Sequence, residues 1–170
     1  QGLIISNPEN IRYIIGIPVE ATILLTDKEN VFITDARYIE EVNNFLTIND
    51  EFIIYDNKDV SEEDNQTFFS DCKNVGFEEN YVTYANYENI IRKYRIRNIE
   101  ETDRIIEKER MIKDEKEILY IEKACEITDK CFEHLLNYIK IGMTERQVAF
   151  EIEKFFLDNG ADGVAFETIV

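Results

Sequence analysis

The stretch LIISNPENIRYIIGIPVEATILLTDKENVFITDARY, residues 3–38, decides the fold class of this chain. It begins with a short apolar run, 3–6, that predicts a buried strand. Asn7 and Pro8 then supply a helix N-cap and a first helical residue, and the helix that they open ends near Gly16. Two further strands, 22–26 and 31–34, flank a polar turn and predict a β-hairpin. A strand, a helix and a hairpin in succession favour an α/β arrangement.

The alternation of strands and helices continues outward from this stretch. The patterns predict a helix over 35–43, a strand over 52–55, a helix over 61–70, a strand over 74–77 and a helix over 83–94. A charge-rich segment, 100–117, follows, and we interpret it as the end of the alternation. Residues 1–110 are therefore predicted to form an α/β domain with helices packed on a mixed sheet.

The last part of the chain, 111–170, has a different pattern. Asp114 and Glu117 form a capping box that opens a helix to about residue 138, and Thr144 and Gln147 open a second helix to about residue 159. Residues 164–170 predict one strand. The apolar stripe predicted for the first of these helices consists of Ile118, Ile121, Cys125, Thr128, Phe132, Leu135 and Ile139. Two amphipathic helices with one strand have little sheet to cover, so we expect a truncated second domain whose helices need a partner, such as a second copy of the chain.

The composition argues against several classes of function. The 170 residues contain 44% hydrophobic side chains and carry a formal net charge of −17, which indicates a globular chain that repels phosphate backbones and anionic lipid. We therefore expect no nucleic-acid and no membrane partner. The three cysteines follow no metal or redox spacing, and they predict free thiols in a reducing cytoplasm.

The residues that could carry chemistry mostly have structural interpretations. The chain has one histidine, His134, so several histidines cannot form a metal site within it; we expect His134 on the surface or interface of a helix. Cys125 and Cys131 are predicted to pack in the core. The acidic clusters, Glu78-Glu79 among them, lie at helix starts and turns and predict solvated, capping roles. The sequence thus assigns no catalytic and no metal-ligating residue.

Five segments together indicate a family. They occur in the order SNPENIRYIIGI (6–17), TDARY (34–38), RMIKDEKEI (110–118), GMTERQVAFEIEKFF (142–156) and GADGVAFETIV (160–170). The set resembles the Xaa-Pro peptidases of the pita-bread metallopeptidase group, which are prolidase (Xaa-Pro dipeptidase), aminopeptidase P and their creatinase relatives. The similarity covers essentially the whole chain.

The resemblance implies a fold and an activity. Residues 1–110 would form a creatinase-type, ribonuclease-H-like, three-layer α/β domain with a mixed sheet. Residues 111–170 would form the first two helices and first strand of a truncated pita-bread α+β catalytic domain. The parent would be a cytoplasmic, homodimeric hydrolase, a metallo-aminopeptidase or Xaa-Pro dipeptidase that cleaves the bond before proline in a peptide substrate. Two divalent metal ions, commonly manganese, would generate the attacking hydroxide.

The resemblance also implies that this chain lacks the catalytic centre. The family's metal ligands are two Asp, one His and two Glu, and all lie beyond the segment matched by 160–170. We therefore expect an N-terminal fragment that binds no cofactor and is inactive alone, and whose role in the parent is to support dimerisation and to shape the active-site entrance.

One loop is the candidate for that role. In the family, the loop after the matched helix lies near the subunit interface and the partner's active-site mouth. The matching loop here consists of Gly16, Ile17, Pro18, Val19 and Glu20. Arg37 and Tyr38 follow a strand end, where α/β folds place functional groups, but we expect Arg37 to pair with a carboxylate and Tyr38 to pack.

Two other functions stay open from the sequence. Pita-bread relatives without metal ligands serve as protein-binding modules, including in a histone chaperone, and the net charge of −17 suits a basic partner. The second alternative is a creatine-type amidinohydrolase, which keeps the fold and changes the chemistry. The ligands in the parent sequence distinguish the peptidase from the binding module.

Overall fold

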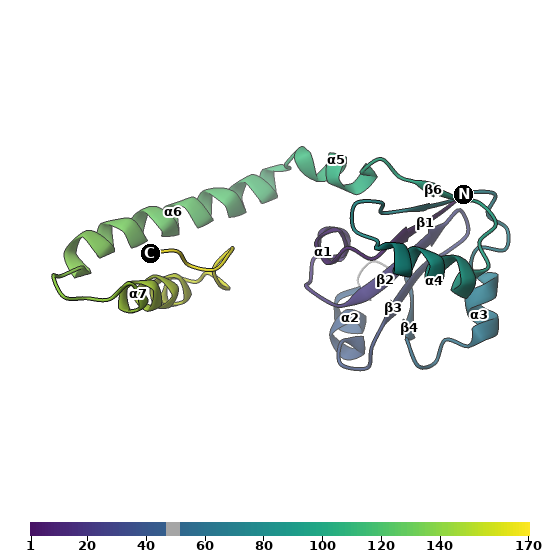
Figure 1. Ribbon diagram of the computed structural model, residues 1–170, viewed down its shortest axis with the longest axis horizontal. Coiled ribbons are helices and arrows are strands. Elements are labelled where there is room, and N and C mark those ends of the chain that lie inside the picture. The colour runs from purple at the N-terminus through teal and green to yellow at the C-terminus, as the bar shows by residue number, and fades with distance from the viewer. Residues whose placement is uncertain (47–51) are drawn as a thin grey trace. The chain divides into compact units, whose positions relative to one another are not determined.

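The computed structural model of the chain describes residues 1–46 and 52–170. The chain folds into two compact units, Gln1–Met111 and Ile112–Val170. Figure 1 colours the first unit from purple to teal and the second from green to yellow. The first unit contains the β-sheet, whereas the second is helical.

The first unit is built on a six-stranded mixed sheet of order β4-β3-β2-β1-β5-β6. The strands are β1 (Gly2–Ile5), β2 (Ala21–Thr26), β3 (Asn30–Thr34), β4 (Phe52–Asp56), β5 (Val75–Phe77) and β6 (Ile99–Glu101). Strand β2 runs antiparallel to both of its neighbours, and the other adjacent strands are parallel. The mixed sheet and the β2–β3 hairpin predicted from the sequence are confirmed.

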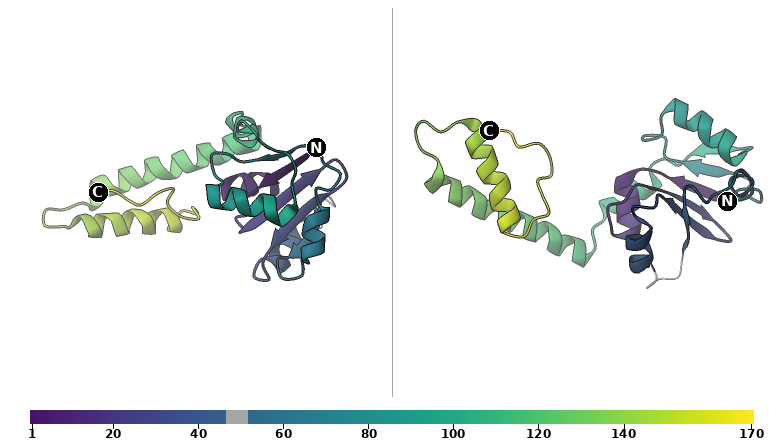
Figure 2. Two further views of the ribbon diagram at one scale, coloured as in Figure 1. Left: turned by 45° about the vertical axis from the view of Figure 1, so that its right-hand side comes forward. Right: turned by 90° about the horizontal axis from the view of Figure 1, so that it is seen from below.

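Helices cover both faces of this sheet, as Figure 2 shows. The helices of the unit are α1 (Pro8–Ile15), α2 (Ile39–Leu46), α3 (Glu62–Thr67), α4 (Tyr84–Tyr94) and α5 (Ile105–Met111). Successive strand residues alternate between two cores, because side chains on a strand point to opposite faces: Ile4 packs in the core of α4, and Ile5 in the core of α1 and α2. This three-layer α/β unit is the predicted fold class.

The interpretation of 100–117 as the end of the alternation was wrong. This segment lies partly in β6, which pairs in parallel with β5, and it contains α5. The β6 residues are partly or fully exposed at the edge of the sheet, so no buried apolar alternation marks them. The β6 residues form a strand because they pair with β5, and not because of their local sequence pattern.

The second unit is a helical hairpin of α6 (Glu115–Tyr138) and α7 (Glu145–Asp158). Both predicted capping boxes are present, at Asp114 and Thr144. The buried side chains of the pair are Ile127, Cys131 and Val148.

Three expectations for this unit differ from the structure. Most of the predicted α6 stripe is exposed, including Cys125, which was expected in the core. The reason is that α7 packs on a neighbouring face of α6, the face that carries Ile127 and Cys131. Residues 164–170 form no strand, since no described residue provides a ladder for them. Among the described residues, no helix combines the length and the hydropathy that a membrane crossing requires.

Candidate functional site

The loop 16–20 connects α1 to β2 and is anchored at both ends. Gly16 ends α1 in the left-handed conformation, with φ 84°, and its N–H donates to the Arg12 carbonyl. Val19 is buried in the core that α1 and α2 share. The Thr34 hydroxyl donates to the Glu20 carbonyl over 2.7 Å. The loop therefore holds a fixed path and leaves Pro18 and the Glu20 carboxylate exposed.

Arg37 links this loop to the end of β3. Its guanidinium donates to Asp35 Oδ2 over 2.6 Å and to Glu20 Oε2 over 3.0 Å, and it lies over the Tyr38 ring, 5.1 Å from the ring centroid. The hydrogen bond from Arg37 holds the pKa of Asp35 below its usual range, and the same bond raises the pKa of Arg37. Arg37 pairs with carboxylates, as the sequence predicts.

A surface hollow of about 490 Å³ lies beside the loop. Ile17 and Phe45 give it an apolar part, and Arg37, Glu40 and Glu41 give it charged groups of both signs. The structure thus brings the predicted loop and the TDARY segment together at one hollow. The hollow can accept an apolar side chain next to a charged terminus of a ligand.

Gly16→Ala is expected to destabilise the fold by about 1–2 kcal/mol. The backbone at Gly16 has φ +84°, and an added Cβ would lie 2.9 Å from Phe45 Cζ. Gly163→Ala is the matched control, since nothing lies within 4 Å of its added Cβ. Urea unfolding followed by circular dichroism measures both variants. Equal midpoints for the two would contradict the strain argument.

Arg37→Gln is expected to raise the pKa of Asp35 toward its ordinary value of 3.8, because Arg37 is the main group that lowers it. A depressed carboxyl pKa stabilises the folded state above the unfolded pKa, and this contribution disappears as the pH falls through the folded pKa. The wild type should therefore be more stable than Arg37→Gln at neutral pH, and this difference in stability should disappear in acid below pH 3.8.

Carbon-detected NMR titration of the Asp35 carboxyl group, with thermal unfolding at each pH, tests this expectation. Lys58→Gln is the control, because Lys58 contributes least among the charges that act on Asp35. An Asp35 pKa that is unchanged in Arg37→Gln would show that the ion pair does not persist in solution.

A buried polar cluster was missed from the sequence. Glu78, expected to be solvated, is only 5% exposed. Its carboxylate accepts hydrogen bonds from the backbone N–H groups of Ser6 and Asn7, over 2.6 and 2.7 Å, and from Asn10 Nδ2 over 2.6 Å. The negative charge therefore faces the N-terminus of α1. Its position directly after the apolar run of β5 was the available signal, because that end of β5 lies beside the same end of the parallel strand β1.

Asn10 extends this cluster to α5. Its side chain donates to Glu107 Oε1 over 2.9 Å and accepts from Arg110 Nη1 over 2.7 Å. Asn10 is completely buried, so these bonds satisfy a side-chain amide whose burial without partners would destabilise the fold. The cluster joins α1, α5 and the end of β5 within the first unit.

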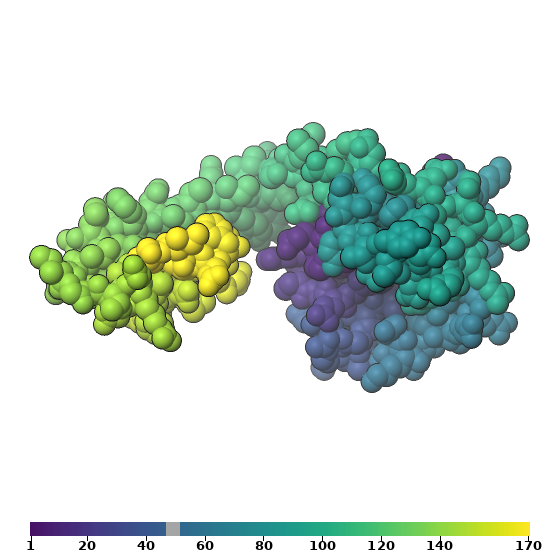
Figure 3. Space-filling model, viewed as in Figure 1, coloured from purple at the N-terminus to yellow at the C-terminus, as the bar shows by residue number. Residues whose placement is uncertain are grey.

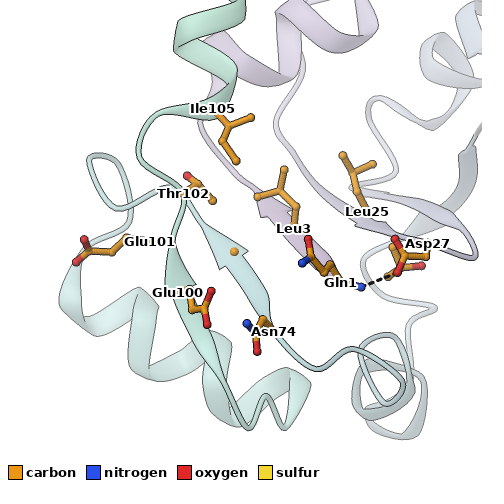
Figure 4. Close-up of a pocket in the computed structure, with 12 residues that line it drawn as sticks. Gln1, Leu3, Leu25, Asp27, Asn74, Glu100, Glu101, Thr102 and Ile105 are labelled. Carbon is orange, nitrogen blue, oxygen red and sulfur yellow. Dashed lines mark hydrogen bonds and ion pairs between the residues drawn. The ribbon is translucent and has the colours of Figure 1, made fainter.

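A second hollow, of about 410 Å³, is lined by residues of β1, β2, β5 and β6. Figure 4 shows the side chains of Leu3, Leu25 and Ile105 around it, with Glu100 and Glu101 on β6. Neighbouring residues on a strand point to opposite faces, so these two carboxylates do not converge on one ligand. The geometry gives no catalytic group here.

The described residues do not supply a metal site. No group of three or more His, Cys, Asp or Glu side chains among them could hold a metal ion. His134 lies 2.8 Å from Glu151 Oε1 and stacks on Phe155 with 5.0 Å between ring centroids, so it joins α6 to α7. The described part of this chain therefore offers no step through a metal.

Fold and site together define a three-layer α/β unit that presents an ion-paired loop, followed by a helical hairpin. Residues 1–112 match the creatinase/prolidase N-terminal domain family, and residues 120–170 match metallopeptidase family M24. The chain belongs to the creatinase/prolidase family.

Individual relatives agree with this assignment. An Xaa-Pro dipeptidase of Pyrococcus horikoshii is 40% identical over 79 residues, which cover 46% of this chain and 22% of the relative. An uncharacterized peptidase of Bacillus subtilis, YqhT, is 33% identical over 185 residues, which cover 100% of this chain and 48% of the relative.

Solved structures match along nearly the whole chain. The X-Pro aminopeptidase of Thermotoga maritima superposes with a TM-score of 0.84 at 27% identity and covers 99% of this chain and 49% of its own. The prolidase of Pyrococcus horikoshii superposes with a TM-score of 0.84 at 29% identity and covers 99% of this chain and 47% of its own. The chain thus spans about half the length of the relatives that it matches from end to end.

Proposed function

We propose that this chain is the N-terminal portion of a metal-dependent Xaa-Pro peptidase. One observation carries the proposal: the chain matches the creatinase/prolidase N-terminal domain and then the M24 family in that order. The superposition on an X-Pro aminopeptidase and a prolidase over 99% of the chain supports it. The substrate class is a peptide with proline after the scissile bond.

In this proposal the chain divides into a creatinase-type domain, 1–110, and the start of a pita-bread catalytic domain, 111–170. The first domain supports homodimerisation of the parent, and the second contributes helices to the catalytic domain. The free cysteines support a cytoplasmic location. The parent binds two divalent metal ions, manganese by preference, through ligands that the described residues of this chain do not provide.

The loop Gly16, Ile17, Pro18, Val19 and Glu20 is proposed to shape the active-site entrance or the dimer contact. Anchoring by Val19 and Thr34 keeps the exposed part of the loop in one conformation, which reduces the entropy lost when a peptide or a subunit docks. The adjacent hollow joins the Ile17 and Phe45 side chains to the Arg37 cation. These groups suit a short peptide, which has an apolar side chain and a charged end.

The test is a hydrolysis assay of the full-length protein whose reading frame contains this chain. With added manganese, the full-length protein is expected to cleave Ala-Pro and to leave the matched dipeptide Ala-Ala intact. The chain 1–170 alone is expected to cleave neither. A folded, metal-loaded full-length protein without Xaa-Pro cleavage would overturn the peptidase proposal, and a stable complex with a basic protein would then favour the binding module. Hydrolysis of creatine would favour the amidinohydrolase.

The role of the loop needs a separate measurement in the full-length protein. Glu20→Gln and Pro18→Gly are expected to raise KM for Ala-Pro several-fold with little change in kcat, because they alter docking and not chemistry. Lys73→Gln, an exposed change away from the loop, serves as the control. Unchanged KM in both loop variants, together with an unchanged dimer mass by light scattering, would remove the loop from the proposal.

A further inference from the structure

A polar hollow lies between α4 and the sheet. Its volume is about 250 Å³. Ile4 and Ile90, which belong to the core or pack against it, form its apolar floor. Helix α4, which is labelled in Figure 1 and drawn with its side chains in the space-filling view of Figure 3, supplies one wall. Ser6 and Thr22, from neighbouring strand ends, supply the other. We refer to it as the α4 hollow.

Most polar side chains of the α4 hollow have no partner within the protein. Within the described part of the chain, several of them form no hydrogen bond and no ion pair: Thr22, Tyr81, Asn86, Asn89, Lys93 and Tyr94. All six carry hydrogen-bond donors. Tyr81, Asn86 and Asn89 are exposed, so water can satisfy them, whereas Thr22 and Lys93 are partly buried and Tyr94 is only 3% exposed. Buried polar groups normally find partners in the protein, so the unpartnered Tyr94 beside the partly buried Thr22 and Lys93 leaves donors that a ligand in the hollow can use.

Lys93 gives the α4 hollow a positive charge. It lies in the last turn of α4, its Nζ is 5.1 Å from the centroid of the Tyr94 ring, and no described carboxylate pairs with it. Burial lowers the pKa of Lys93 and raises the pKa of Tyr94 to about 12. A partly buried ammonium group without a counter-ion gains free energy when an anion binds beside it.

The surroundings of the α4 hollow favour an anion further. The chain contains 36 acidic residues, yet no described residue that lines this hollow is acidic. One lining residue, Ser6, contacts a carboxylate, because its hydroxyl lies 3.4 Å from Glu78 Oε2. Glu78 is already bound by the three donors of the buried cluster, which offset its charge.

We infer that the α4 hollow binds a small oxyanion, a carboxylate or a phosphate group, through Lys93 and the neutral donors around it. The position agrees with a general rule, because ligands of open α/β sheets bind beyond the carboxyl ends of parallel strands, and Ser6 and Tyr81 follow β1 and β5. The volume exceeds that of a single water and is smaller than most drug-sized pockets.

The test is an NMR titration of the ¹⁵N-labelled chain with sodium phosphate and, separately, with sodium acetate. Sodium chloride keeps the ionic strength constant, so that screening does not change during the titration. We expect saturable shifts of the Ser6, Asn86 and Lys93 amides with one of these anions or both. Lys93→Gln is expected to weaken binding by about tenfold or more, because a charge-assisted hydrogen bond is lost.

Two variants separate binding from folding. Lys73→Gln removes a lysine that is exposed and outside the hollow, and it should leave the affinity unchanged. Thr22→Val removes a neutral donor from the opposite wall and should weaken binding several-fold while Lys93 stays in place. Binding of phosphate alone or acetate alone would identify the anion. Shifts that do not saturate, or equal affinities in Lys93→Gln and Lys73→Gln, would overturn the inference.

Discussion

Phe32→Ala is expected to lower the free energy of unfolding of the first unit by about 3–5 kcal/mol. Phe32 is completely buried in the core that α1 and α2 share, on the central part of β3. Its ring meets Phe52 of β4 edge to face, with 6.2 Å between centroids. Truncation would leave a cavity at the junction of two strands and two helices. Urea unfolding followed by circular dichroism gives the magnitude.

Two matched variants show whether burial causes this loss. Phe32→Leu keeps most of the buried surface and should cost about 1 kcal/mol. Tyr84→Ala truncates an aromatic ring that is 78% exposed and should cost less than about 1 kcal/mol. A Phe32→Ala effect as small as that of Tyr84→Ala would mean that the core of the first unit is loosely packed in solution.

Glu78→Ala is expected to destabilise the first unit by about 3 kcal/mol or more. The change removes the acceptor of four hydrogen bonds in a place that is almost fully buried. It leaves the Ser6 and Asn7 amides without their partner and removes one of the bonds of Asn10. The charge that faces the start of α1 disappears as well. Urea unfolding measures the loss, and hydrogen exchange locates it.

The exchange pattern gives the sharper criterion for Glu78. We expect the Ser6 and Asn7 amides to lose protection in Glu78→Ala by more than the strand amides of β3 do. Glu88→Ala, which removes an exposed carboxylate from α4, is the control and should change stability by less than about 0.5 kcal/mol. Unaltered protection at Ser6 and Asn7 would contradict the bonding that the structure shows.

Much of the fold was predictable from local pattern. The caps at Asn7, Ser61 and Thr83 are all present, because a cap depends on a side chain and backbone within the same few residues. The strands β1, β2 and β3 were also predictable, since they are central and buried on both faces. Strand β6 was not, because it is a short, exposed edge strand whose existence depends on β5.

The candidate site was likewise predictable from the sequence only in part. The loop 16–20 was marked by Gly16 and Pro18, and the pairing of Arg37 with a carboxylate was expected from the sequence. That the partners are Asp35 and Glu20 could be seen only when β2 and β3 were paired. Lys93 gave no signal at all, because its neighbours in the α4 hollow come from β2 and from the segments that follow β1 and β5.

The sequence by itself determined the order of helices and strands up to α4, the capped starts of α6 and α7, and the family, because each depends on short-range pattern or on ordered segments. Only the tertiary structure decided that β6 and α5 extend the first unit, that Glu78 is buried, and that the donors around Lys93 converge. The physical reason is that burial and charge pairing depend on the groups that folding brings together, and strand order in a mixed sheet joins segments that lie far apart along the chain.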